Sequence, residues 1–523
     1  VGSEMCIRDR RKGYYRYGTG ENDLLSGNVT LSYSKAFAEK HQVYVGLDYS
    51  ISQRNLTDYI FEAEGFSNAN LSFMANAKQY LYQGSPRGDR SMVRMVGVTG
   101  NANYTFDNRY YADFSFRVDG NSKFGSEKRF APFYSLGVGW NLHNEKFMKE
   151  LNVFSNLRFK ASYGISGSQD FTIESVNTTY RYYPDQRYLL WSAAKLMGYG
   201  NPSLTWQNTR EINIGTEIGL FKNRIMAELN YYDKNTTNLL SSMDLPLSSG
   251  FSNYTANIGE MNNKGIEASL NAYIIRDYQR ELNWMIGGQI VYNRNKIIKL
   301  SDAIKAQNKR YLEQGTEVSN LFYEGNPINA IYAVRSAGID PSTGREVYYD
   351  KDGNLAKTWN PQDKVYMGSS EPLWRGNFRT MVMYKNFTFN ASFGYHWGGM
   401  LYNSTLRNRV EVSRATIAEK NVDERVLSQR WLQPGDVSFF KAISNEPTKA
   451  TSRYVFNDRM LELQNVSLQY RWNNQWLRDK TGIESLVFGI NASNLAYWSS
   501  VKYERGTSYP FARNVQGSIT LTF

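Results

Sequence analysis

The chain has 523 residues, 15% of them aromatic, and a formal net charge of +12. No run of about eighteen apolar residues occurs, which excludes a membrane-spanning helix. The single cysteine, Cys6, excludes an internal disulfide and a cysteine metal cluster. Lysine and arginine residues are spread along the chain rather than gathered in one patch, so the charge does not favour nucleic-acid binding.

Residues 1–10 match nothing that follows in pattern. They contain no apolar stretch of the kind found in a signal peptide, and they resemble the mis-assembled or adapter-derived ends of environmental sequences. We therefore expect a non-native leader and exclude Cys6 from fold reasoning. We expect residues 11–523 to fold together, with the true amino terminus missing.

Apolar and polar residues alternate along the whole chain in segments of about ten residues, the length that a tilted strand needs to cross a bilayer. The alternating segments are residues 29–37, 43–51, 111–117, 211–220, 266–274, 387–395, 486–492 and 515–523. The last one ends on the aromatic carboxyl terminus, Phe523. An open, half-apolar edge strand would invite pairing with other chains, whereas a closed barrel pairs its last strand with its first. This segment alone leaves both a transmembrane barrel and a soluble sandwich open.

The connections between these segments decide between the two folds. Short connections are predicted near residues 38–41, 106–109, 221–224, 276–281 and 385–387, with longer turns at 142–152 and 472–483. Long connections are predicted near 52–91, 118–131, 166–209, 233–263, 296–375, 397–458 and 493–514. This alternation is typical of tight periplasmic turns and long extracellular loops. We predict an all-β, antiparallel transmembrane β-barrel: about 15 strands of a presumed 22, without the plug domain.

Several segments of the sequence resemble the SusC/RagA family of TonB-linked outer-membrane proteins from Bacteroidetes. They lie at residues 103–110, 117–125, 133–140, 157–164, 201–206, 257–267, 460–468 and 491–495. The similarity covers nearly all of residues 27–523 in the family's order. In residues 119–122, Asp-Gly-Asn-Ser, we expect a turn in which Gly120 takes a positive φ.

The resemblance implies an importer of a bulky nutrient, glycan or peptide, beneath a SusD-like lipoprotein. Energy would come from TonB–ExbB–ExbD through an upstream plug and TonB box, so this chain is expected to be a partial barrel that cannot couple to TonB by itself. We expect its sheet to be open and strongly curved, or a distorted smaller barrel, in contact with outer-membrane lipid. Phe523 resembles the terminal aromatic residue that the barrel-assembly machinery recognises, although a place in an aromatic girdle is the alternative. A passive porin or adhesin barrel remains the rival function.

No arrangement of residues indicates an enzyme, a cofactor or a metal. Residues 350–354, Asp-Lys-Asp-Gly-Asn, favour a β-turn over a calcium loop, because ligands are missing at the expected spacing. Aromatic residues in the 180–206 loop suit stacking on sugar rings, and packing within the loop is the alternative. The predicted substrate-binding residues are Tyr182, Tyr183, Trp191 and Trp206.

Overall fold

The computed structural model describes residues 14–66, 70, 73–81, 87–124, 128–168, 176–245, 250–251, 253–313, 321–502 and 512–523. The expected leader, residues 1–10 with Cys6, lies outside these ranges. The chain divides into two units. Unit 1 is Val1–Tyr104, Asp113–Ser135 and Gln169–Trp206, and unit 2 is Thr105–Ala112, Leu136–Ser168 and Gln207–Phe523.

The predicted all-β architecture is confirmed. Fifteen strands follow one another in hydrogen-bonded order: β1 (Tyr14–Phe37), β2 (His41–Glu64), β4 (Arg87–Phe106), β5 (Tyr110–Asn121), β6 (Phe130–Asn141), β7 (Phe154–Ser168), β10 (Gln207–Leu220), β11 (Ile225–Thr237), β14 (Gly259–Asp277), β15 (Leu282–Leu300), β21 (Trp374–Tyr384), β22 (Phe387–Tyr402), β23 (Val455–Trp472), β24 (Ser485–Ser499) and β25 (Asn514–Thr522). A sixteenth, β3 (Gln79–Tyr80), pairs with β2. Within the described residues, β1 and β25 each have one neighbour along this order, so the order is open at both ends.

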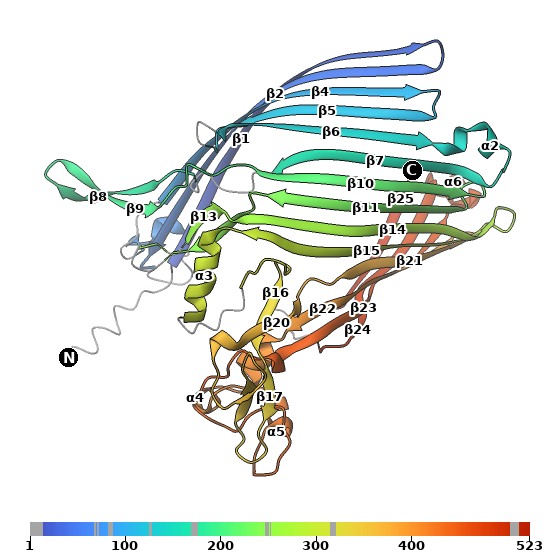
Figure 1. The fold of residues 1–523 in the computed structure, drawn as a ribbon. Helices are drawn as coiled ribbons and strands as arrows, with labels where there is room; N and C mark the ends of the chain where they lie inside the picture. The colour runs from blue at the N-terminus through green and yellow to red at the C-terminus, as the bar shows by residue number, and fades with distance from the viewer. Residues whose placement is uncertain are drawn as a thin grey trace. The chain divides into compact units, whose positions relative to one another are not determined.

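From β7 to β25 the neighbouring strands of unit 2 pair antiparallel, as β10, β11, β14 and β15 illustrate in Figure 1. The tight turn between β10 and β11 contains Phe221, Lys222 and Asn223, all with positive φ. Positive φ in a hairpin turn matches the right-handed twist of the flanking strands. The predicted short turn at 221–224 is therefore confirmed.

Many strands are longer than the predicted ten residues, and this corrects the predicted loop boundaries. β1 and β2 have 24 residues each and stay in register from Phe37↔His41 to Tyr14↔Glu64. A strand of about ten residues already crosses a bilayer, so both strands extend beyond that thickness. The predicted long loop at 52–91 is too wide, because β2 continues to Glu64 and β4 begins at Arg87.

Gly120 also corrects a prediction, since it lies inside β5 and is not among the residues with positive φ. A Cβ atom at this position would clash with the ring of Phe130. The glycine is therefore required by the close approach of an aromatic side chain, and the chain leaves the strand one residue later, at Asn121.

The residues that carry the resemblance around 257–267 form a polar lattice across three strands of unit 2. Lys264 on β14 lies 2.9 Å from Asp233 on β11, which also accepts a 2.6 Å hydrogen bond from Asn262. On the other side, Asn263 accepts a 2.8 Å hydrogen bond from Asn295 on β15. This lattice fixes the pairing of three strands through side chains as well as backbone.

The remaining helices and strands lie in the connections. They are η1 (Met74–Asn76), η3 (Leu142–Asn144), α2 (Lys146–Lys149), β8 (Thr179–Tyr188), β9 (Trp191–Gly198), β12 (Leu240–Asp244), β13 (Asn253–Asn257), α3 (Asp302–Glu313), β16 (Ala330–Val334), β17 (Ser336–Ile339), β18 (Glu346–Tyr349), β19 (Leu355–Ala356), η6 (Pro361–Asp363), β20 (Lys364–Ser369), η7 (Leu406–Val410), α4 (Arg414–Glu419), α5 (Arg425–Gln429), η8 (Ser452–Tyr454) and α6 (Gln475–Thr481). Among the residues that the structure describes, no helix is long and apolar enough to cross a membrane.

The buried apolar clusters of unit 2 lie mainly in its long connections. One cluster joins Ile304 of α3 to Ile297 and Leu300 at the end of β15. Two more contain Tyr332 and Phe440 respectively. Residues 321–372 and 403–454 hold these last two, and we call the two segments the loop cluster. Figure 1 shows their elements β16, β17, β20, α4 and α5 gathered together.

Candidate functional site

The sheet of unit 2 has one apolar face, and that face is exposed. Ile214 of β10, Ile266 of β14 and Leu468 of β23 lie on this face by strand register and are 54%, 46% and 46% exposed. A two-layer soluble fold would bury such rows. Exposed apolar rows over a tilted sheet are instead what a lipid-facing barrel wall presents.

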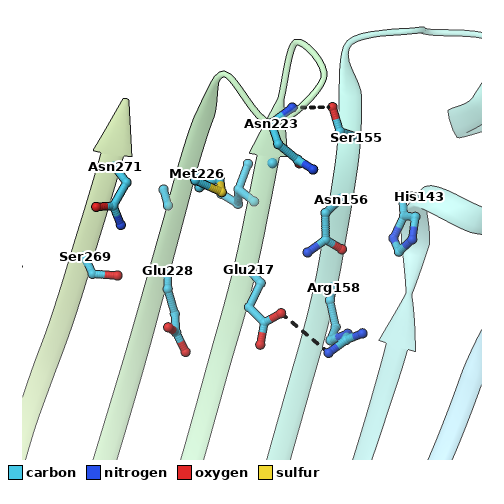
Figure 2. Close-up of a pocket in the computed structure, with 13 residues that line it drawn as sticks. His143, Ser155, Asn156, Arg158, Glu217, Asn223, Met226, Glu228, Ser269 and Asn271 are labelled. Carbon is cyan, nitrogen blue, oxygen red and sulfur yellow. Dashed lines mark hydrogen bonds and ion pairs between the residues drawn. The ribbon is translucent and has the colours of Figure 1, made fainter. Parts of the chain in front are cut away.

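The opposite face of the same strands is polar and carries cross-strand ion pairs. Lys160 on β7 lies 3.2 Å from Glu217 on β10 and 2.7 Å from Glu228 on β11. Arg158 lies 3.5 Å from Glu217. Figure 2 shows Arg158, Glu217 and Glu228 pointing to the same side of neighbouring strands.

Arg158, Glu217 and Glu228 border a polar hollow of about 480 Å³ on that face. Its wall also includes His143, Asn156, Ser269 and Asn271, so hydrogen-bond donors and acceptors of both charges are available together. Such a surface can contact a hydrated solute or a polar protein surface, as the inner side of a barrel does.

A second polar group lies where β6 leads into the turn before β7. The Glu145 carboxylate accepts hydrogen bonds from Tyr110 (2.8 Å), Arg109 (3.0 Å) and the Trp140 indole (3.1 Å). These bonds, with Trp140 contributing most, hold the pKa of Glu145 below its ordinary value. The cluster gives a structural reason for Arg109, Tyr110 and Trp140, which lie in the segments that carry the resemblance. The cluster is structural, because these contacts hold the turn before β7 against Tyr110 of β5 and Trp140 of β6.

The loop cluster is held by one buried arginine between two buried glutamates. The Arg453 guanidinium lies 2.9 Å from Glu346 and 2.6 Å from Glu411, and the three side chains are 6%, 2% and 0% exposed. Burial disfavours the charge on Arg453, but the hydrogen bonds to both glutamates outweigh burial and raise its pKa. Thr451 adds a 2.8 Å hydrogen bond to Glu346. The network joins Arg453 to Glu346, which is more than a hundred residues away in sequence.

The sequence reasoning missed this network. Glu346 lies in one segment of the loop cluster and Glu411 and Arg453 lie far apart in the other, with no spacing that a local pattern would reveal. Only the folding of two long connections against each other brings them together.

Three of the four predicted substrate-binding residues lie in the hairpin β8–β9 of unit 1. Tyr182 and Trp191 are 69% and 77% exposed, and Tyr183 is partly exposed. By register Tyr182 faces Ala194 and Tyr183 faces Ala193, so the two tyrosines lie on opposite faces of the hairpin. Because the residue across the hairpin from each tyrosine is a small alanine, no large side chain on the partner strand covers either ring.

Trp206, the fourth predicted residue, is packed into unit 1. Only 4% of it is exposed, and its ring stacks on Phe124 with centroids 4.4 Å apart. Its indole N–H donates a 3.1 Å hydrogen bond to the carbonyl of Lys128. The position corresponds to the packing alternative for this residue, and its ring is not available to a ligand.

The possible calcium loop forms a turn closed on itself. Both carboxylate oxygens of Asp350 accept hydrogen bonds from Asn354, at 2.8 Å from its backbone and 3.1 Å from its side chain. These bonds hold the pKa of Asp350 below its ordinary value. Among the described residues, no group of three or more His, Cys, Asp or Glu side chains is placed to hold a metal ion.

The carboxyl-terminal strand has the predicted alternation. In β25, Val515 and Ile519 lie on the apolar face with exposed fractions of 72% and 65%, and Phe523 follows the strand at 80% exposed. With that exposure, the Phe523 ring is free to be recognised or to sit in a lipid interface.

Several known proteins are similar to this chain in sequence. The TonB-dependent receptor P3 of Formosa agariphila is 26% identical over 506 residues, which cover 90% of this chain and 49% of that protein. The TonB-dependent receptor SusC of Bacteroides thetaiotaomicron is 27% identical over 415 residues, covering 73% of this chain and 38% of SusC. The chain thus spans about half or less of the length of these curated relatives.

Among solved structures, that of the RagAB peptide transporter matches with a TM-score of 0.82 at 23% identity, over 93% of this chain and 53% of that one. This likeness shows a shared fold. A family model described as TonB dependent receptor-like, beta-barrel matches residues 7–411. The resemblance to SusC/RagA proteins is thereby confirmed, and the chain belongs to the TonB-dependent receptor-like β-barrel family.

Proposed function

We propose that this chain forms part of the wall of an outer-membrane β-barrel that imports a bulky nutrient, glycan or peptide. One observation supports this above the others: the sheet of unit 2 is apolar and exposed on one side and polar with ion pairs on the other. Such a wall separates lipid from an aqueous lumen. The energy would come from TonB–ExbB–ExbD, acting through a plug domain and TonB box of the full-length receptor.

Two surfaces, considered separately, are proposed to contact partners. The loop cluster of unit 2 would contact a SusD-like lipoprotein or cargo, and the β8–β9 hairpin of unit 1 would contact cargo. Phe523 is the residue that the barrel-assembly machinery would recognise. Tyr182, Tyr183 and Trp191 would contact the cargo through their exposed ring faces, which bury large area at low entropy cost. Trp206 would instead hold the loop that carries the hairpin.

The test of import is uptake by cells that express the full-length receptor containing this chain. Fluorescently labelled oligosaccharide and peptide pools are offered to cells with and without a functional TonB. We expect uptake of one pool that is lost without TonB. Uptake that persists in cells lacking TonB would support the rival, a passive porin, and overturn the proposal.

The contribution of the hairpin is tested with Tyr182→Ala combined with Trp191→Ala. The control is Tyr278→Ala, because Tyr278 is similarly exposed (70%) but lies in the short turn between β14 and β15. We expect the double variant to reduce uptake by up to roughly thirtyfold at equal surface abundance, since stacking contributes about 1 kcal/mol per ring and the variant removes two rings. Equal uptake by the double variant and the control would remove the hairpin from the cargo site.

A further inference from the structure

The hairpin β8–β9 places two cations directly opposite each other. In its register Arg181 pairs with Lys195, so both side chains point to the same face with Cβ atoms about 5 Å apart. Both residues are exposed. Among the side chains that the structure describes, which leave out residues 184–186 and 188 of the hairpin, no carboxylate forms an ion pair with either of them.

Like charges directly across a strand pair destabilise it, and a two-stranded hairpin has little other stability to spare. Tyr180 and Tyr182 point to the other face, opposite Leu196 and Ala194, so the two faces differ in character. One is aromatic and apolar, and the other carries the two cations. A sequence selected only for hairpin stability would favour an acidic residue at one of the two cationic positions.

The cationic face also carries one aromatic ring. Tyr183 stands two residues from Arg181 on the same strand and therefore on the same face, about 7 Å away, and it is partly exposed opposite the small Ala193. A carboxylate or sulfate is bonded directly to a sugar ring or stands only one or two atoms away from it, and the long side chains of Arg181 and Lys195 can lean toward the Tyr183 ring to reach it. Two cations beside one accessible ring thus match a charged sugar unit.

We propose that this face binds anionic sugar units, with Arg181 and Lys195 contacting a carboxylate or sulfate and Tyr183 stacking on the sugar ring. The inference rests on the proposed import function and narrows its cargo to acidic glycans. A neutral glycan would leave the two cations uncompensated. An acidic peptide would satisfy them but would make less use of the flat ring faces exposed on both sides and at the tip of the hairpin.

The experiment uses the full-length receptor in detergent and three probes with one backbone: dextran, carboxymethyl dextran and dextran sulfate. We expect the two anionic probes to bind roughly tenfold more tightly than dextran at low ionic strength, because two exposed charge contacts contribute about 1.4 kcal/mol together. The preference should shrink as salt is added.

The key variant is Lys195→Glu, which converts the repulsive pair into an attractive one and so keeps the hairpin folded. We expect it to abolish the preference for both anionic probes, and Lys195→Gln to reduce it. The matched control, Lys222→Gln with Lys351→Gln, removes two exposed lysines elsewhere and should keep the preference. An equal loss in this control would show that only net charge matters and would overturn the site.

Two further outcomes would overturn the proposal. One is an unchanged preference in Lys195→Glu, and the other is poly-L-glutamate binding as tightly as the anionic dextrans, which would assign the face to acidic peptides. Neither outcome depends on energy coupling. Uptake that persists without TonB would instead refute import while leaving the measured charge preference intact, so the two failures are distinguishable.

Discussion

Replacing Arg453 with methionine should open the loop cluster without unfolding the barrel wall. The variant leaves Glu346 and Glu411 facing each other at 2% and 0% exposure, without the guanidinium that now pairs with both. Removing one partner of a buried ion pair costs about 3–5 kcal/mol, because the remaining charge stays buried and unpaired. Local opening of the cluster should therefore become roughly a hundred to several thousand times more frequent.

The assay is backbone hydrogen exchange followed by mass spectrometry on the full-length receptor in detergent. Peptides from the loop cluster should lose protection, while peptides from β14 and β15 serve as an internal reference. The matched control is Arg425→Met, because Arg425 forms its ion pair with Asp423 at 2.7 Å in the same cluster but at 20% and 33% exposure. That pair should contribute at most about 1 kcal/mol.

A second variant separates lost charge balance from lost packing. Adding Glu346→Gln and Glu411→Gln to Arg453→Met removes the two orphaned charges and should restore part of the protection. Equal exchange in Arg453→Met and Arg425→Met would refute the reasoning, since it would mean that removing a buried arginine costs the loop cluster no more stability than removing an exposed one.

Three further outcomes are expected. Glu145→Gln should lower the unfolding temperature of the receptor in detergent at neutral pH and have less effect under acid conditions. The pKa of Glu145 is depressed in the folded state, so the carboxylate stabilises the fold above its unfolded-state pKa. This stabilisation is lost as the pH falls through the folded-state pKa. A pH-independent difference would contradict this. Gly265→Leu should lower the same temperature by an amount equivalent to about 1–3 kcal/mol, because a Cβ there would meet the carbonyl of Tyr292 and the hydroxyl of Tyr232, whereas Gly517→Ala, with open space at its Cβ, serves as the tolerated control. Phe523→Ser should reduce the amount of heat-modifiable, folded barrel in the outer membrane, with Phe221→Ser as the exposed-aromatic control. If the two variants assemble equally well, Phe523 is not a recognition signal and belongs only to the aromatic girdle.

Local chemistry was enough to predict the wall. The alternation in residues 515–523 reports two different surroundings on the two faces of a strand, whatever the neighbouring strands are. The turn around Lys222 and Asn223 is likewise set by a few adjacent residues. Such short-range patterns also predicted the antiparallel strands, the order of short and long connections, and the resemblance to the family. These predictions were confirmed.

The strand ends and the loop interiors required the tertiary structure. β2 continues to Glu64 because β1 stays paired with it, and Gly120 is needed because Phe130 lies over it. Trp206 is buried because Phe124 stacks on its ring. The Arg453 network exists only when two long connections fold against each other. The sequence by itself determined which face of a strand is apolar and which is polar, since that depends on single residues. The structure decided which side chains are buried in the loops, since burial depends on partners that are distant along the chain.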